Sequence, residues 1–337
     1  MVTIKDISKA CGVSPATVSK ALNGYTDISE ETVALVRQKA TELNYTPSAA
    51  ARLLKTNTSH NIGVLFVDET MSGLTHEYFS YILNSVKEEA ELNGYDITFI
   101  SRSAGKTETT FLQHCRYRNC DGVVIASVNF ENPSVTELVN SEVPVVTIDY
   151  SFDNVSSVIS DNVRGAHELA SMLIENGHRR IAFIHGEMTS VTRKRIAGFN
   201  RALHENEIRI PPEYIVEGAY HDANVTREAT ARLMDLPAPP TAILFPDDIS
   251  SLGGMAELQS RGLSIPDDVS VVGYDGIYLS GMLQPALTTW HQDAEMIGKE
   301  SVRKLIETIE HRSTCASEEI MISGWLMEGA SVRKLES

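Results

Sequence analysis

The sequence predicts an α/β protein of two unequal parts, a small all-helical head and a larger body of alternating strands and helices. Three short amphipathic helical patterns follow one another within residues 1–60. From residue 61 onward, short runs rich in β-branched residues alternate with longer helical patterns, which is typical of parallel sheets. With 337 residues, the chain is long enough for two or three domains of roughly 150 residues each.

The two parts also differ in net charge. The whole chain carries a net charge of −16, which by itself argues against a nucleic-acid partner. Residues 1–60, however, contain seven Lys and Arg against five Asp and Glu, a net charge of +2, and the remaining 22 basic and 40 acidic residues give −18. The head and the body are therefore expected to meet different partners.

The sequence gives no sign of export or of a metal site. No apolar run approaches the ~18 residues of a membrane-spanning helix, and the N-terminus lacks the pattern of a secretory signal. Cys115 and Cys120 could form half of a zinc site, but no second pair follows, and Cys11 and Cys315 lie far away. We expect reduced thiols, no bound metal, no membrane contact and a cytoplasmic location.

The helices of the head have clear start signals. Thr3 and Asp6 have the spacing of a capping box at the start of the first helix. Ser14 caps the second helix, with Pro15 in its first turn, and Ser29 caps the third. Two short helices joined by a tight glycine turn, with a third packed across them, are typical of a helix-turn-helix.

The outward face of the second helix favours DNA binding over a small helical subdomain that packs on the body. A purely solvated face would more often carry Glu and Lys. This face instead carries small or hydrogen-bonding residues that allow close approach to a groove, namely Ser14, Ala16, Thr17, Ser19 and Lys20.

In the body, strands and helices alternate. Strands are expected over residues 62–67, 96–101, 122–126, 145–148, 180–184, 242–245 and 269–273. Helices are expected over residues 78–93, 161–176, 192–206, 224–234, 250–261 and 293–311. Repeated Asn-Gly helix stops at 93–94 and 176–177 lead directly into strands and indicate two duplicated lobes, whose ligands would bind at the carboxyl ends of the strands.

No enzyme motif accompanies these strands. The glycine patterns of dinucleotide, phosphate and hydrolase sites are missing, as is the zinc-binding H-E-x-x-H motif. Asp247 and Asp248 form an acidic pair after a strand, but no third metal ligand can be named. We therefore predict neither an enzyme nor a cofactor.

Two stretches of the head, TIKDISKACGVSPATVSKALNG and ISEETVALVRQKATELNYTPSAAARLLKT, carry a specific resemblance. They are similar, without a gap over residues 2–56, to the DNA-binding head of the lactose/galactose-repressor (LacI/GalR) family of bacterial transcription regulators. More loosely, VPVVTID, NGHRRIAFIHG, TRKRIAGF, TAILFPDD, VSVVGYDG and LTTWHQD resemble the body of that family.

The resemblance implies a domain organisation. Residues 1–60 would form the helix-turn-helix domain, and residues 61–337 a type-I periplasmic-binding-protein-like body of two Rossmann-like lobes. The N-lobe would comprise about 61–160 and 292–319, and the C-lobe about 161–291 and 320–337. The chain would cross between the lobes near Ser160, 290–292 and Glu319.

The resemblance also implies DNA contacts. The family reads bases at three positions that are here Pro15, Ala16 and Lys20; the first two offer only apolar contact, whereas Lys20 can donate to guanine. The hydroxyl and amide groups suited to phosphate oxygens are those of Thr3, Ser14, Thr17, Ser19 and Asn23.

Residues 47–56 resemble the hinge helix of the family, which folds on DNA. Leu54 matches the leucine that enters the minor groove and kinks the duplex. Ala51 would allow close approach of the backbone, and Lys55 would meet a phosphate or the groove floor. Residues 56–60 form a polar linker.

The effector positions carried over from the family are Asp149, Arg195, Tyr220, Asp247, Asp275 and Gln292. The planar donors of Arg195 suit hydroxyl pairs or a carboxylate, Asp275 would accept from the ligand, and Tyr220 would stack on it. Asp149 as a turn former and Gln292 as a packing residue are the alternatives. In the loop 70–77 and just after it, His76, Tyr78 and Phe79 are candidate lid residues. This set suits a carbohydrate, and a nucleobase fits nearly as well.

Together these implications predict an allosteric repressor of carbohydrate-utilisation genes. It would bind a near-palindromic DNA operator as a homodimer, and an effector between the lobes would change its affinity. No leucine heptad precedes Ser337, so we expect no tetramer-forming tail. The alternative is a cytoplasmic sugar or nucleobase sensor whose head does not recognise a specific operator.

Overall fold

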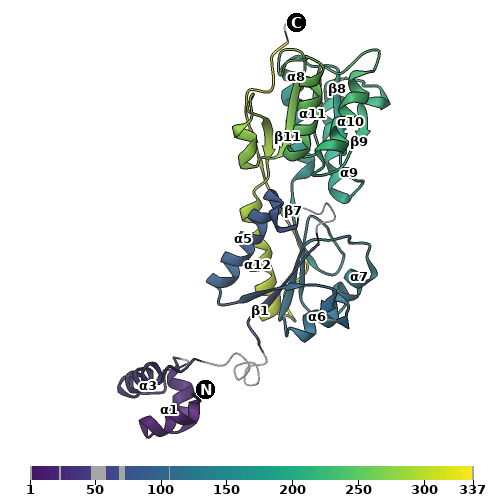
Figure 1. Cartoon of the computed structure of the whole chain (residues 1–337). Coiled ribbons are helices and arrows are strands. Elements are labelled where there is room, and N and C mark those ends of the chain that lie inside the picture. The colour runs from purple at the N-terminus through teal and green to yellow at the C-terminus, as the bar shows by residue number, and fades with distance from the viewer. Residues whose placement is uncertain (1, 23, 47–57, 68–72, 106, 336–337) are drawn as a thin grey trace. The chain divides into compact units, whose positions relative to one another are not determined.

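The computed structural model describes residues 2–22, 24–46, 58–67, 73–105 and 107–335. They divide into two compact units, Met1–Ser59 and His60–Ser337 (Figure 1).

The first unit is the predicted helix-turn-helix head. Its helices are α1 (Ile4–Cys11), α2 (Pro15–Leu22) and α3 (Glu30–Glu42). They pack around a small core of Ile7, Val18, Ala21, Val36 and Ala40. The predicted start signals are present: the Asp6 carboxylate accepts from the Thr3 amide at 2.9 Å, and Ser14 Oγ accepts from the Thr17 amide at 3.0 Å.

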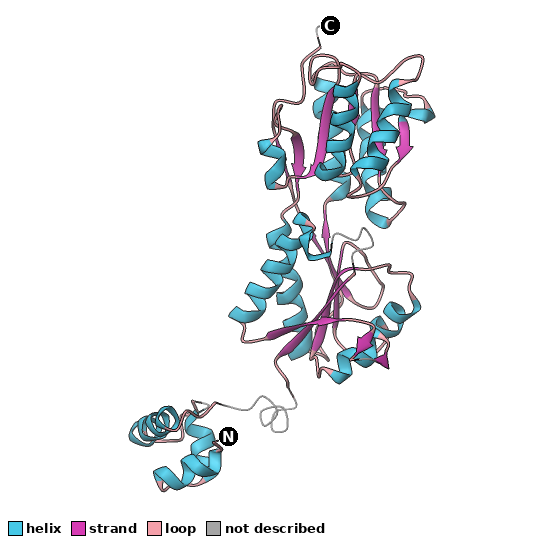
Figure 2. Ribbon diagram, in the orientation of Figure 1, coloured by secondary structure: helices cyan, strands magenta, loops and turns pink. Residues whose placement is uncertain are grey.

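Two six-stranded sheets form the second unit within the described residues, which confirms the predicted two-lobed α/β body (Figure 2). The first sheet runs in the order β13-β7-β6-β5-β1-β2 and is parallel throughout. Its strands are β1 (Asn61–Phe66), β2 (Asp96–Ile100), β5 (Gly122–Ser127), β6 (Val145–Ile148), β7 (Ser156–Ser160) and β13 (Glu319–Ile322). A short hairpin, β3 (Ser103–Ala104) with β4 (Thr107–Glu108), forms a separate two-stranded sheet.

The second sheet runs in the order β14-β12-β11-β10-β8-β9 and is parallel except for β14. Its strands are β8 (Ile181–His185), β9 (Ile215–Glu217), β10 (Ala242–Leu244), β11 (Ser270–Asp275), β12 (Thr288–His291) and β14 (Trp325–Met327). The described chain passes between the sheets after β7, after β12 and between β13 and β14. The last crossing lies beyond the expected Glu319, because Glu319–Ile322 pairs with β7.

Helices cover both faces of each sheet, as burial of parallel strands on both faces requires. On the first sheet, α5 (Glu77–Leu92) and α12 (Ala294–Glu310) share one core, and α6 (Phe111–Tyr117) and α7 (Pro133–Val139) share another on the opposite face (Figure 1). Gly298 allows α5 and α12 to pack closely, because a Cβ at this position would lie 2.0 Å from Ser85 Oγ.

On the second sheet, α8 (Asn162–Glu175) and α9 (Ser190–Glu205) cover one face and α10 (Ala223–Met234) and α11 (Asp248–Ser260) the other. Short 3₁₀ turns are η1 (Gly73–Thr75), η2 (Pro212–Tyr214) and η3 (Tyr278–Met282).

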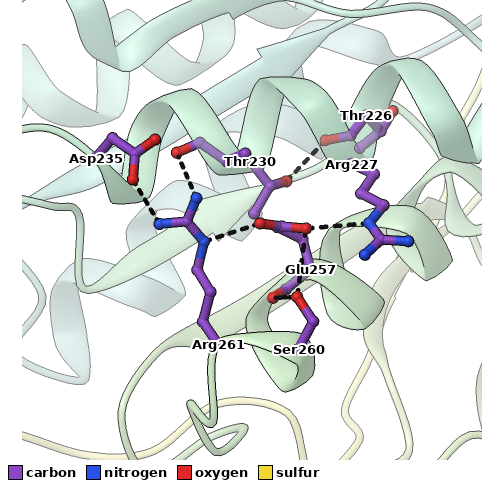
Figure 3. Close-up of polar contacts among 8 residues, drawn as sticks. Thr226, Arg227, Thr230, Asp235, Glu257, Ser260 and Arg261 are labelled. Carbon is purple, nitrogen blue, oxygen red and sulfur yellow. Dashed lines mark hydrogen bonds and ion pairs between the residues drawn. The ribbon is translucent and has the colours of Figure 1, made fainter.

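An ion-pair network joins α10 to α11 (Figure 3). Glu257 accepts from Arg227 Nε at 3.0 Å and from Arg261 Nε at 2.8 Å, and Arg261 also donates to Asp235 at 2.6 Å. The two guanidinium groups lower the pKa of Glu257. The network links the two outer helices of the C-lobe.

Candidate functional site

The outward face of α2 is the candidate DNA surface of the head. Ser14, Pro15 and Ala16 are exposed, whereas Thr17, Ser19 and Lys20 are half-buried. Lys20 Nζ forms an ion pair with Asp27, and this hydrogen bond lowers the pKa of the Asp27 carboxyl. Of the other predicted contacts, Thr3 is exposed and bonded to Asp6. Asn23, Ala51, Leu54 and Lys55 lie outside the described residues.

Helix α9 places Arg195 in a buried position in the C-lobe. Its Nε donates to Asn162 Oδ1 and its Nη1 to the Pro246 carbonyl, both at 2.8 Å. The guanidinium carbon lies 3.5 Å from the centre of the Tyr274 ring, a cation–π contact. These contacts fix the plane of the guanidinium, and Nη2 takes part in neither of the two hydrogen bonds.

Asp275 and Gln292 form a second fixed pair. Asp275 ends β11 with φ 101°, a conformation that costs a non-glycine residue free energy and is concentrated at functional sites. Its Oδ1 accepts from Gln292 Nε2 at 2.7 Å. Gln292 Oε1 is buried and has no hydrogen-bond partner among the described residues. Burial raises the pKa of Asp275 well above its usual range, and Arg195 opposes this effect.

Asp149 contributes an N-lobe carboxyl group close to Arg195. It follows β6 with φ 56°, and its Oδ1 accepts from the Ser160 amide at 2.7 Å. Its carbonyl accepts from Ser190 Oγ of the other lobe at 3.1 Å. Burial raises the pKa of Asp149, whereas the bond to Ser160 and the charge of Arg195 lower it. Burial and the nearby Asp149 also raise the pKa of Tyr78, so its phenol lies beside these charges.

Tyr220 and Asp247 have structural partners as well. The Tyr220 hydroxyl lies 2.8 Å from Thr192 Oγ1, and its ring centre is 5.7 Å from the Arg195 guanidinium. Asp247 caps α11: its carboxylate accepts from the Ser250 amide and hydroxyl, both at 2.7 Å, and from the His221 amide at 2.9 Å. Asp247 therefore shapes the loop around Tyr220.

Aromatic rings from the two lobes also contact each other. The His76 and His221 rings have centres 3.4 Å apart, and the Phe79 ring lies 4.8 Å from that of His76. Two of the candidate lid residues, His76 and Phe79, thus contact one another where the lobes meet.

Six residues form what we call the interlobe cluster: Tyr78, Asp149, Arg195, Tyr220, Asp275 and Gln292. Sequence reasoning missed Asn162, Thr192 and Tyr274, which hold Arg195 and Tyr220. Because each of them lies in an ordinary helix or strand pattern, the sequence carries no signal for this role. The cluster combines a cation, carboxyl groups, an unused amide oxygen and aromatic faces, which are groups that suit a small polar ring.

The described part of the chain meets the requirements of neither a metal site nor a membrane-spanning helix. Within it, no group of three or more His, Cys, Asp or Glu side chains could hold a metal ion. No described helix combines the length and the apolar character needed to cross a membrane.

Comparison with known proteins gives consistent matches. Residues 3–48 match the family described as bacterial regulatory proteins, lacI family, and residues 170–332 match the periplasmic binding protein-like domain. The chain is 33% identical over 319 residues to the HTH-type transcriptional repressor PurR of Pasteurella multocida, covering 93% of both chains. It is 34% identical over 319 residues to the protein of the same name from Aliivibrio fischeri, again covering 93% of both.

The fold matches solved structures over nearly the whole chain. The lac repressor dimer bound to operator and the anti-inducer ONPF aligns with a TM-score of 0.81 and 26% identity, covering 98% of this chain and 99% of that one. The match includes both the helical head and the two-sheet body.

Proposed function

The chain belongs to the lacI family of bacterial regulatory proteins, and from this premise we propose that it is a transcriptional repressor whose grip on operator DNA is set by a small effector between its lobes. It is a regulator and not an enzyme. The observation that carries the effector part of the proposal is the interlobe cluster, with its buried and unpartnered Gln292 Oε1. The proposed place of action is the cytoplasm, where operator DNA lies.

The proposed DNA contacts divide into two kinds. Lys20 donates to a base, while Pro15 and Ala16 make apolar contacts in the major groove. The phosphate contacts come from Thr3, Ser14, Thr17, Ser19 and Asn23, and the hinge contacts from Ala51, Leu54 and Lys55. In a homodimer, the two heads would occupy the two halves of a near-palindromic operator. The dimer form of the lac repressor supports this arrangement.

The proposed effector is a small ring that carries hydrogen-bond donors. A buried amide oxygen without a partner costs about 1–3 kcal/mol, so a ligand N–H or O–H facing Gln292 Oε1 gains that amount. Asp275 would accept from the same edge, Arg195 Nη2 would donate, and Tyr220 would cover a ring face. Asp149 and Asp247 would complete the polar rim. A carbohydrate meets these requirements, and a planar nucleobase, whose ring face Tyr220 would cover, meets them as well.

The proposed coupling runs through contacts that cross between the lobes. Ser190 Oγ donates to the Asp149 carbonyl at 3.1 Å, and the Tyr278 amide donates to Glu77 Oε1 at 2.9 Å. A ligand that changes the angle between the lobes changes both contacts. Such coupling is typically worth about 1–3 kcal/mol and is reciprocal, so DNA must alter effector affinity by the same factor.

Operator binding can be tested by fluorescence anisotropy with labelled DNA from upstream of the coding sequence. We expect binding with a steep log–log salt dependence, because each neutralised phosphate releases counterions. Scrambled DNA of the same length serves as the control and should bind at least about 1,000-fold more weakly. Equal affinity for both DNAs would favour the alternative, a sugar or nucleobase sensor without a specific operator.

The effector class can be tested by a thermal-shift screen of monosaccharides, disaccharides and nucleobases with the full chain. Ligand at about 100 times its Kd stabilises the native state by about 2.7 kcal/mol, which raises Tm by several degrees. Stabilisation by sugars alone would support the carbohydrate assignment, and stabilisation by nucleobases alone would replace it with the second candidate. No shift with any of them would remove both classes from the proposal.

A further inference from the structure

The end of α6 brings two cysteines together. The helix ends at Tyr117 with Arg118 as its C-cap, and Asn119 follows with φ 51°, the left-handed conformation of a helix C-terminus. The Cys120 amide then donates back to the Cys115 carbonyl at 3.1 Å. This is the 6→1 bond of a Schellman motif, in which the side chains at these two positions contact each other. In most proteins that contact is hydrophobic, whereas here it joins two thiols.

The two sulfur atoms differ in access. Cys115 is fully buried in the core beneath α6 and α7, whereas Cys120 is half-buried. The hydrogen bond with the Cys120 thiol lowers the pKa of Cys115, and burial opposes this effect. The backbone bond between the residues keeps their Cα atoms close, as a disulfide requires.

The same turn anchors the start of the body. Asn61 Nδ2 lies 3.5 Å from Cys120 Sγ and donates to the Arg118 carbonyl at 3.0 Å. The His60 amide donates to Asp121 Oδ2 at 2.7 Å. His60 and Asn61 are the first residues of the second unit, where the chain arrives from the head. A displacement of Cys120 therefore acts on the first residues of the second unit.

We propose that Cys115 and Cys120 form a modification site at which a hydroperoxide oxidises the two thiols to an intrachain disulfide. Formation of the disulfide weakens the hydrogen bonds that hold His60 and Asn61. One thiolate attacks the peroxide O–O bond, giving a sulfenic acid and, after proton uptake, one water. The second sulfur attacks the sulfenic sulfur, forming the S–S bond and expelling a second water. The two thiols lose two electrons and two protons in total, and hydrogen peroxide is reduced to two waters.

The weakening of the contacts of His60 and Asn61 follows from the close packing around Cys115. The core around Cys115 is close-packed, so the bond is made chiefly by movement of Cys120. That movement draws Cys120 Sγ away from Asn61 Nδ2 and shifts the neighbouring Asp121, which holds the His60 amide.

The remaining cysteines provide internal controls. Cys11 lies in the head, where its sulfur faces the Leu35 carbonyl. Cys315 follows α12 and lies 3.6 Å from Thr308 Oγ1. Neither is hydrogen-bonded to a second cysteine in the described structure, so the double variant Cys11→Ser, Cys315→Ser should keep the reaction.

The test treats the full-length double variant with hydrogen peroxide and follows mass and amide exchange. We expect a mass loss of about 2 Da, a Cys115–Cys120 linked peptide, and at least several-fold faster amide exchange in residues 58–62. Reduction should restore both mass and exchange, and Cys120→Ser should block both changes. Full alkylation of both thiols after peroxide, a bond to another partner, or unchanged exchange with the disulfide formed would overturn the proposal. None of these readouts depends on DNA or effector.

Discussion

Replacing Arg195 with methionine is expected to abolish the response of operator binding to effector. The guanidinium is buried at the interlobe cluster, held by Asn162 and the Pro246 carbonyl and stacked on Tyr274. Methionine preserves most of the stem volume but removes the guanidinium donors. We expect effector affinity to fall at least about 100-fold, about 2.7 kcal/mol, as measured by calorimetric titration. Operator affinity without effector should stay within a few-fold of the original.

A matched control lies two residues away on the same helix. Arg193 is exposed, and its contact is a 3.3 Å bond to the Met188 carbonyl, so Arg193→Met should leave effector affinity unchanged. The Arg195 variant leaves buried acceptors on Asn162 and Pro246 without a donor, which lowers stability, so circular dichroism must show that it is folded at the assay temperature. Effector binding by a folded Arg195→Met protein at the original affinity would place the ligand elsewhere.

The main elements of the fold could be predicted because their signals are local. Each expected strand and helix of the body overlaps one in the structure. The elements that were not expected are short or weakly patterned. The buried strand β7 reads Ser-Ser-Val-Ile-Ser, which lacks an apolar run, and β14 depends on pairing with β12 across more than thirty residues of chain. Helices α6 and α7 are only two turns long, too short for a periodic pattern to stand out.

The site could be predicted only in part. Asp149 and Asp275 follow from their places at strand ends and Arg195 from the family resemblance, and the structure brings the three within electrostatic reach of one another. Asn162 could not be predicted, because its role depends on how α8 packs against α9. The pairing of Gln292 with Asp275 likewise joins the end of β11 to the segment after β12 and leaves no local trace.

Removing the Asp248 carboxyl is expected to destabilise the C-lobe severely. This buried residue is the neighbour of the cap residue Asp247, and its two oxygens accept from the Ile277 amide at 3.0 Å, Ser280 Oγ at 2.6 Å and Thr289 Oγ1 at 2.6 Å. Asp248→Ala leaves these donors buried without an acceptor, at about 1–3 kcal/mol for each that finds no new partner. A loss of about 3–5 kcal/mol should lower Tm by about 10 °C in thermal unfolding.

The conservative variant makes the prediction specific, because burial raises the pKa of Asp248 to about 7. In the unfolded chain the pKa of an aspartate is about 3.9, so the native state takes up a proton between these values. The contribution of this group is greatest at low pH and is lost as pH rises from about 4 to about 7. Asp248→Asn stays neutral at every pH, so its deficit relative to the original chain should be larger at pH 5 than at pH 8. Urea unfolding at both pH values measures it, with the exposed Asp267→Asn as the matched control. An equal deficit at both pH values would mean that Asp248 is ionised throughout and that its three donors outweigh its burial.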